Sequence, residues 1–102
     1  MREIDIEGLE RVLADGAALV DVRQPQEYVA AHVPGAVLVP MAELGYRVDE
    51  LDKEEPVYLI CHSGHRSGAI AELLADQGFD AVNVAGGTAA WVHSGRPFDQ
   101  GL

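Results

Sequence analysis

The feature that most constrains this chain is the alternation of short apolar runs with amphipathic helical patterns. The runs are rich in Val, Leu and Ile and lack a polar–apolar alternation; they lie at residues 18–22, 36–39, 57–60 and 80–85, with a shorter candidate at 3–6. Strands of this kind are buried on both faces, which is typical of a parallel sheet between helices. The sequence therefore predicts an α/β fold of three layers, with a central, mainly parallel five-stranded sheet flanked by helices.

Helical patterns separate these runs. Their spacing predicts helices over 7–16, 24–32, 41–51, 68–78 and 86–95, and a tail over 96–102. Pro25 suits the first position of its helix, whereas Gly45 weakens the third. A chain of 102 residues has the size of one compact domain, so residues 1–102 are predicted to form a single domain.

Charge and composition restrict the partners. The net charge of −10, from 17 acidic and 7 basic residues, argues against nucleic acid, because phosphate contacts need clustered Lys and Arg. Any anion site must therefore be built locally, from a few nearby donors and cations.

No run approaches the ~20 apolar residues of a membrane span, and the charged N-terminus does not resemble a signal peptide. One cysteine suits a reducing compartment. We therefore expect a cytoplasmic protein with no membrane partner.

That single cysteine begins the segment CHSGHRS, residues 61–67, which we call the cysteine loop. It lies between a predicted buried strand and the strongest helical pattern, at the strand end where ligands of parallel sheets gather. The helix start offers unpaired N–H groups, and Gly64 and Gly68 allow these to form an anion-binding nest. Arg66 adds a permanent cation, His62 and His65 add donors, and no acidic residue lies within 56–71.

All of these features favour a thiolate over a thiol. We therefore predict that the pKa of Cys61 lies below its reference value of about 8.5, and that Cys61 is a nucleophile inside an anion-binding loop. One alternative is a small buried core residue. Another is a zinc site of Cys61, His62 and His65, which is disfavoured because a tight turn rarely directs three such side chains inward. No metal and no cofactor are expected.

Three ordered segments resemble the rhodanese-homology domain, of the single-domain thiosulfate sulfurtransferase type, over nearly the whole chain. LVDVRQPQEYVAAHVPGAVLVP (19–40) is similar to the early signature of that family, VYLICHSGHRSGAIAELLADQGF (57–79) to its active-site strand, loop and helix, and VNVAGGTAAWVHSGRP (82–97) to its closing Gly-Gly-x-x-x-Trp segment. The resemblance implies the same α/β fold, and implies that Asp21, Arg23, His32, Pro34 and Gly35 are structural.

The resemblance implies sulfur transfer. Cys61 would accept sulfane sulfur from a small donor, thiosulfate or a persulfide, and cyanide or a thiol would remove it. The anion-binding loop would comprise the residues after the cysteine, with Arg66 fixing the loop and the donor: His62, Ser63, Gly64, His65, Arg66 and Ser67. From Cys61 to Arg66 the loop has six residues, as in sulfurtransferases, whereas the related phosphatases and arsenate reductases use seven.

Two positions depart from the family pattern. His62 stands where thiosulfate-using members often have Arg or Lys, which leaves the donor open, and Ala31 stands where a glycine is common. Three alternatives also stay open: a protein-to-protein persulfide relay to a thioredoxin-like acceptor, a non-catalytic interaction module, and a phosphatase. The intact Cys61 disfavours the module, and the loop length disfavours the phosphatase.

Overall fold

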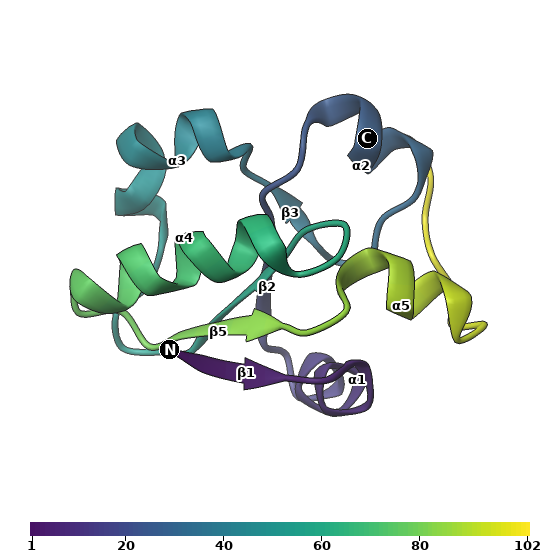
Figure 1. Cartoon of the computed structure of the whole chain (residues 1–102), viewed down its shortest axis with the longest axis horizontal. Coiled ribbons are helices and arrows are strands. Elements are labelled where there is room, and N and C mark those ends of the chain that lie inside the picture. The colour runs from purple at the N-terminus through teal and green to yellow at the C-terminus, as the bar shows by residue number, and fades with distance from the viewer.

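The computed structural model describes the whole chain, residues 1–102. Five strands form one sheet in the order β1-β5-β4-β2-β3, and every neighbouring pair is parallel. The strands are β1 (Arg2–Ile4), β2 (Ala18–Asp21), β3 (Val37–Leu38), β4 (Val57–Ile60) and β5 (Ala81–Val84). The predicted α/β fold with a parallel five-stranded sheet is therefore confirmed (Figure 1).

Five α-helices connect and follow these strands, and a 3₁₀ turn at Val48–Glu50 extends the third. They are α1 (Ile6–Ala14), α2 (Pro25–Ala30), α3 (Met41–Arg47), α4 (His65–Asp76) and α5 (Gly87–His93). Pro25 opens α2, as expected. Two bounds differ most from the sequence prediction: α3 ends at Arg47 rather than at residue 51, and α4 begins at His65 rather than at residue 68. The second half of the cysteine loop is therefore the first turn of this helix.

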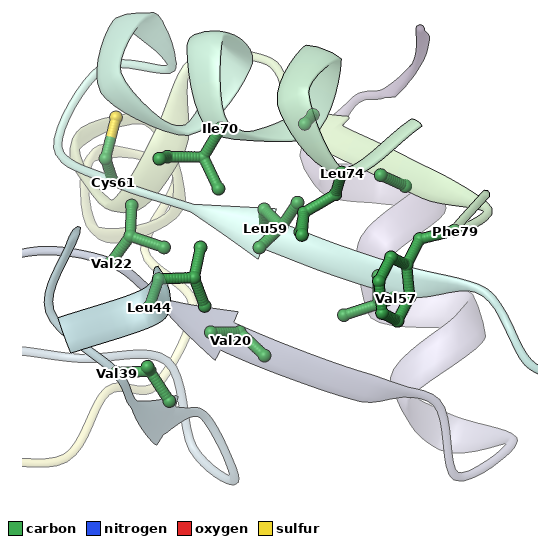
Figure 2. Close-up of a cluster of buried hydrophobic side chains, with 12 residues drawn as sticks. Val20, Val22, Val39, Leu44, Val57, Leu59, Cys61, Ile70, Leu74 and Phe79 are labelled. Carbon is green, nitrogen blue, oxygen red and sulfur yellow. The ribbon is translucent and has the colours of Figure 1, made fainter. Parts of the chain in front are cut away.

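The sheet is covered on both faces, which gives the predicted three layers. Alternate side chains of β4 point to opposite sides, so Val57, Leu59 and Cys61 join a cluster with residues of α3 and α4. Tyr58 and Ile60 join a second cluster with residues of α1, α2 and α5. Figure 2 shows Cys61 at the end of the first cluster, with its sulfur directed away from Val22 and toward the segment before α4.

The strand order places the site. In the strand order, β3 lies next to β2 on one side, and β5 lies next to β4 on the other. The connection from β2 to β3 and the connection from β4 to β5 therefore run in opposite directions along the sheet. At such a switch point the connecting segments diverge and leave a crevice outside the carboxyl ends of the strands. Asp21 and Ile60, the last residues of β2 and β4, are register partners. The segments that follow these two strands therefore begin side by side, and α2 lies near the cysteine loop.

The C-terminal tail packs along α2. The backbones of His32 and Asp99 exchange two hydrogen bonds of 2.9 Å, and Gly101 N–H donates to the carbonyl of Val29. Figure 1 accordingly shows the chain end beside α2. None of the helices combines the length and the apolar character needed to cross a bilayer.

Candidate active site

Cys61 is the first residue after β4, and its side chain is buried, with 1% of the residue exposed. The sulfur nevertheless has polar neighbours on its loop side. Gly64 N–H donates to Sγ at 3.1 Å, and the Ser67 hydroxyl lies 3.3 Å from it. The cysteine thus combines the burial expected of a core residue with the donor shell expected of an anion site. These two interpretations of the sequence do not exclude each other.

Gly64 allows the loop to close over the sulfur. Its φ of +102° lies in the left-handed region, which residues with a Cβ rarely adopt. A Cβ there would lie 3.3 Å from the Val84 carbonyl oxygen of the neighbouring strand. Gly64 is also the N-cap of α4, where its carbonyl accepts from Gly68 N–H. The turn that directs the Gly64 amide at Cys61 is therefore also the turn that starts the helix.

The first turn of α5 holds the cysteine loop from the other side. Thr88 N–H donates to the carbonyl of Cys61, and Ala89 N–H donates to that of His62, both at 2.9 Å. The approach is so close that a Cβ on Gly87 would lie 2.5 Å from each of these carbonyl oxygens. With these two carbonyls fixed against α5, the N–H groups that follow in the loop are free to face the sulfur.

The surroundings lower the pKa of the Cys61 thiol, as the sequence predicted. Burial is the largest influence and raises the pKa, because it disfavours the charged thiolate. Hydrogen bonds outweigh it: they come from the Ser67 hydroxyl and from the backbone N–H groups of Ser67, Gly64 and Ser63. The largest influences that lower the pKa are therefore neutral donors that point at the sulfur.

Asn83 on β5 positions the Ser67 hydroxyl. The Oδ1 atom of Asn83 lies 2.6 Å from Ser67 Oγ, while its Nδ2 donates to the Gly64 carbonyl at 3.1 Å and to Glu3 at 3.0 Å. A hydroxyl has one proton to donate, and a thiolate is a stronger acceptor than a thiol. The single proton is donated to Asn83 Oδ1, the shorter contact, when Cys61 is a thiol, and ionisation of Cys61 favours its donation to the sulfur instead. The buried Asn83 side chain holds both Ser67 and the start of α4 in place.

A Ser67→Ala variant is expected to raise the pKa of Cys61, because it removes the side-chain donor to the thiolate. Only the thiolate reacts with iodoacetamide, so the rate of alkylation increases with pH through this pKa. The inflection of that profile should move to higher pH than in the unmodified protein. Ser63→Ala is the matched control, since the Ser63 hydroxyl contacts His65 rather than the sulfur. Equal inflections for Ser67→Ala and the unmodified protein would contradict the assignment.

Arg66, the cation of the cysteine loop, forms an ion pair with a carboxylate of another element. Its Nη1 and Nη2 donate to the two carboxylate oxygens of Glu27 on α2, each at 2.8 Å. The hydrogen bond from Arg66 is the main reason that the pKa of Glu27 falls to about 2; the same bond raises the pKa of Arg66. The permanent cation expected in the loop is therefore paired with a carboxylate that is distant in sequence.

The remaining side chains of the cysteine loop turn outward. His62, Ser63 and His65 are exposed, and the Ser63 hydroxyl lies 3.0 Å from Nδ1 of His65. With Cys61 buried and both histidines exposed, these three side chains do not converge as zinc ligands would. No group of three or more potential ligand side chains is placed to hold a metal ion.

Sequence reasoning missed three residues of this site: Glu27, Asn83 and Gly87. A signal existed for Asn83. The apolar run 80–85 begins with Asp80, and Asn83 is the one strongly polar side chain in the rest of the run. A polar residue in a strand buried on both faces needs internal partners. No comparable local signal links Glu27 to Arg66, which is 39 positions away.

A family model described as the rhodanese-like domain matches residues 5–94. A sulfurtransferase of Allochromatium vinosum is 38% identical over 100 residues, which cover 95% of this chain and 94% of that protein. YrkF of Bacillus subtilis, described by name as a sulfur carrier protein, is 39% identical over 92 residues; these cover 87% of this chain and 50% of YrkF, so the chain matches half the length of that relative.

Solved structures give the same result. The crystal structure of a rhodanese-related protein from Thermoplasma volcanium superposes with a TM-score of 0.92 at 28% sequence identity. The superposition covers 99% of this chain and 100% of that protein. The overall fold is therefore shared over nearly the whole length of both chains.

Proposed function

Because the chain belongs to the rhodanese-like domain family of sulfurtransferases and sulfur carriers, we propose that it transfers sulfane sulfur through a persulfide on Cys61. The donor is a small sulfane compound such as thiosulfate, and the acceptor is cyanide or a thiol. The observation that carries this proposal is the set of hydrogen-bond donors around the Cys61 sulfur. They favour a thiolate, and they would equally hold the negative charge of a persulfide.

The first half-reaction loads the cysteine. The Cys61 thiolate attacks the outer sulfur of thiosulfate, a new S–S bond forms, and sulfite leaves with the electron pair of the broken S–S bond. The negative charge then lies on the outer sulfur of Cys61–S–S⁻, within reach of the loop amides. In the second half-reaction cyanide attacks that outer sulfur, and thiocyanate and the Cys61 thiolate are formed. The sulfur moves as a neutral atom, so no external oxidant or reductant is needed.

The geometry of the loop suits one sulfur atom better than a phosphate. The donors come from Ser63, Gly64 and Ser67 and point at Sγ itself. A phosphoryl group with three equatorial oxygens needs a wider ring of donors, and the guanidinium of Arg66, which could have served it, is held by Glu27. These features favour sulfur transfer over phosphate hydrolysis.

The direct test is the mass of the intact protein. After incubation with thiosulfate and removal of the excess, the mass should rise by about 32 Da, with the added sulfur on Cys61. Cyanide should return the original mass and produce thiocyanate in equal amount. If neither thiosulfate nor an organic persulfide yields the adduct, the proposal is wrong. An aryl phosphate hydrolysed faster than sulfur is transferred would favour the phosphatase alternative instead.

A second candidate is a relay that passes sulfur to a partner protein such as one of thioredoxin-like fold. It is favoured by one observation. YrkF, of which this chain matches 50% of the length, is described as a sulfur carrier. The chemistry at Cys61 is the same in both cases. The intact cysteine and its donors argue against a purely non-catalytic interaction module.

A further inference from the structure

Charged side chains beside the cysteine loop form two neutral pairs. At the end of β2, the guanidinium of Arg23 contacts the carboxylate of Asp21 at 2.8 Å, and this pair is buried. Arg66, the one lysine or arginine within residues 61–67, contacts Glu27 at 2.8 Å. This second pair is open to solvent, because 37% of the Arg66 side chain and 31% of that of Glu27 are exposed. An anion that approaches the loop therefore meets a cation and a carboxylate together.

Glu27 is fixed in this place from two sides. It is the third residue of α2, where its Oε1 accepts from the backbone N–H of Gln24 at 3.1 Å. Both of its oxygens accept from Arg66, and such two-point contacts between carboxylate and guanidinium are fixed in orientation. Its pKa, lowered to about 2 mainly by the hydrogen bond from Arg66, keeps it ionised wherever Cys61 reacts as a thiolate. Glu27 is therefore a permanent negative charge beside the loop.

Arg66 lies close enough to the sulfur for its charge to act there. The next residue along α4, Ser67, places its hydroxyl 3.3 Å from Cys61 Sγ. The pKa of Arg66 is raised mainly by its hydrogen bond to Glu27, and the negative charge of Cys61 raises it further. Because electrostatic interaction is mutual, the net charge of the Glu27–Arg66 pair also acts on any anion that comes to the sulfur.

Sulfane donors differ in the charge that they bring to this place. Thiosulfate has two negative charges, whereas a thiosulfonate, R–SO₂–S⁻, has one. An unpaired Arg66 would attract the dianion more strongly, because the attraction is proportional to the charge. With Glu27 in place this attraction is cancelled, and the repulsion from the Cys61 thiolate remains. That repulsion is twice as large for thiosulfate, and the net charge of −10 adds to it.

We propose that Glu27 sets the donor specificity of Cys61 by charge. Because it neutralises Arg66, the loop favours sulfane donors with one negative charge, such as thiosulfonates, over the dianion thiosulfate. Glu27 touches no reacting atom, so it is a positioning residue that acts through Arg66. Its effect on sulfur donors rests on the proposed sulfurtransferase function, whereas its effect on the charge felt at Cys61 does not.

The loading step balances for a thiosulfonate as it does for thiosulfate. The Cys61 thiolate attacks the outer sulfur of R–SO₂–S⁻, a new S–S bond forms, and the sulfinate R–SO₂⁻ leaves with the electron pair of the broken S–S bond. The reactants and the products each have a total charge of two, against three for thiosulfate and its product sulfite. No proton, oxidant or reductant takes part.

The charge at the sulfur can be measured without sulfur transfer. Iodoacetate is an anion and iodoacetamide is neutral, and both alkylate the Cys61 thiolate. The ratio of their rate constants at one pH is therefore independent of the thiolate fraction. Glu27→Gln should raise this iodoacetate-to-iodoacetamide ratio about fivefold at low ionic strength, because Arg66 then attracts the anion, and added salt should reduce the gain. A displaced loop would change both rates alike, and an unchanged ratio would overturn the inference.

Two further variants show whether the effect belongs to this pair. Glu50→Gln is the matched control, because Glu50 forms the same two-point pair with Arg47, at 2.9 and 3.0 Å, and bonds to no residue of the cysteine loop. It should leave the ratio nearly unchanged. Glu27→Gln combined with Arg66→Gln removes both charges and should restore the ratio of the unmodified protein. A double variant whose ratio stays as high as that of Glu27→Gln would show that Glu27 does not act through Arg66.

Donor preference is measured by the rate at which the protein gains the mass of one sulfur atom from thiosulfate and from methanethiosulfonate. The thiosulfate rate constant divided by that for methanethiosulfonate should rise about tenfold in Glu27→Gln. Protein that gains the mass from neither donor refutes the sulfurtransferase proposal, and the alkylation ratio still decides the role of Glu27. Protein that is loaded by both donors, with the same preference before and after the substitution, refutes the donor specificity alone.

Discussion

A Cys61→Ser variant is expected to lose sulfur transfer from thiosulfate to cyanide by more than about 10³-fold, as enzymes do when their nucleophile is removed. The alcohol of serine is not ionised near neutral pH, and it forms no persulfide. The fold should persist, because a hydroxyl can use the same donors from Gly64 and Ser67. The cost in the free energy of unfolding should be about 1–2 kcal/mol, since a smaller and more polar atom replaces a buried sulfur.

Thiocyanate production and urea unfolding measure the two effects separately. A matched control restores a thiol outside the loop: Cys61→Ser combined with Ala14→Cys, at the exposed end of α1. That double variant has a cysteine without converging donors, and it should stay as inactive as Cys61→Ser. Recovery of transfer in the double variant would show that any accessible thiol suffices, and that the loop is not the source of activity.

Gly87→Ala should be the most damaging substitution outside the cysteine loop. The residue has a φ of +60°, and its Cβ would lie 2.5 Å from the carbonyl oxygens of Cys61 and His62. These are backbone atoms that cannot move without moving the loop itself. We expect a loss of about 3 kcal/mol or more in the free energy of unfolding, and a fall in Tm of more than about 10 °C. Sulfur transfer should fall with it, because α5 would no longer hold the loop carbonyls.

Gly16→Ala is the matched control for backbone strain. Gly16 also has a left-handed φ, of +89°, but no atom lies within 4 Å of its Cβ position. This variant should lose about 1 kcal/mol and keep its transfer rate. Thermal unfolding and thiocyanate production, measured on both variants, separate the two causes. Similar losses in Gly87→Ala and Gly16→Ala would show that strain rather than the contact with the loop explains the effect.

Much of the fold could be predicted from the sequence because its signals are local. Apolar runs without alternation indicate strands buried on both faces, and each of them became a strand of the parallel sheet. The start of α4 was missed by three residues because HRS has no apolar periodicity; the left-handed Gly64 sets that boundary. The lowered pKa of Cys61 was predicted correctly, and neutral hydrogen-bond donors are the largest influences that lower it.

The sequence by itself determined the class of fold, the position of Cys61 at a strand end, and the glycine that turns the chain back over the sulfur. These follow from hydrophobic periodicity and from the backbone freedom of single residues, which act over a few positions. Only the tertiary structure decided which distant groups complete the site: Glu27 on Arg66, Asn83 on Ser67, and the amides of α5 on the loop carbonyls. The physical reason is the strand order. Parallel crossovers bring together the carboxyl ends of β2, β4 and β5, and the segments that follow them meet there.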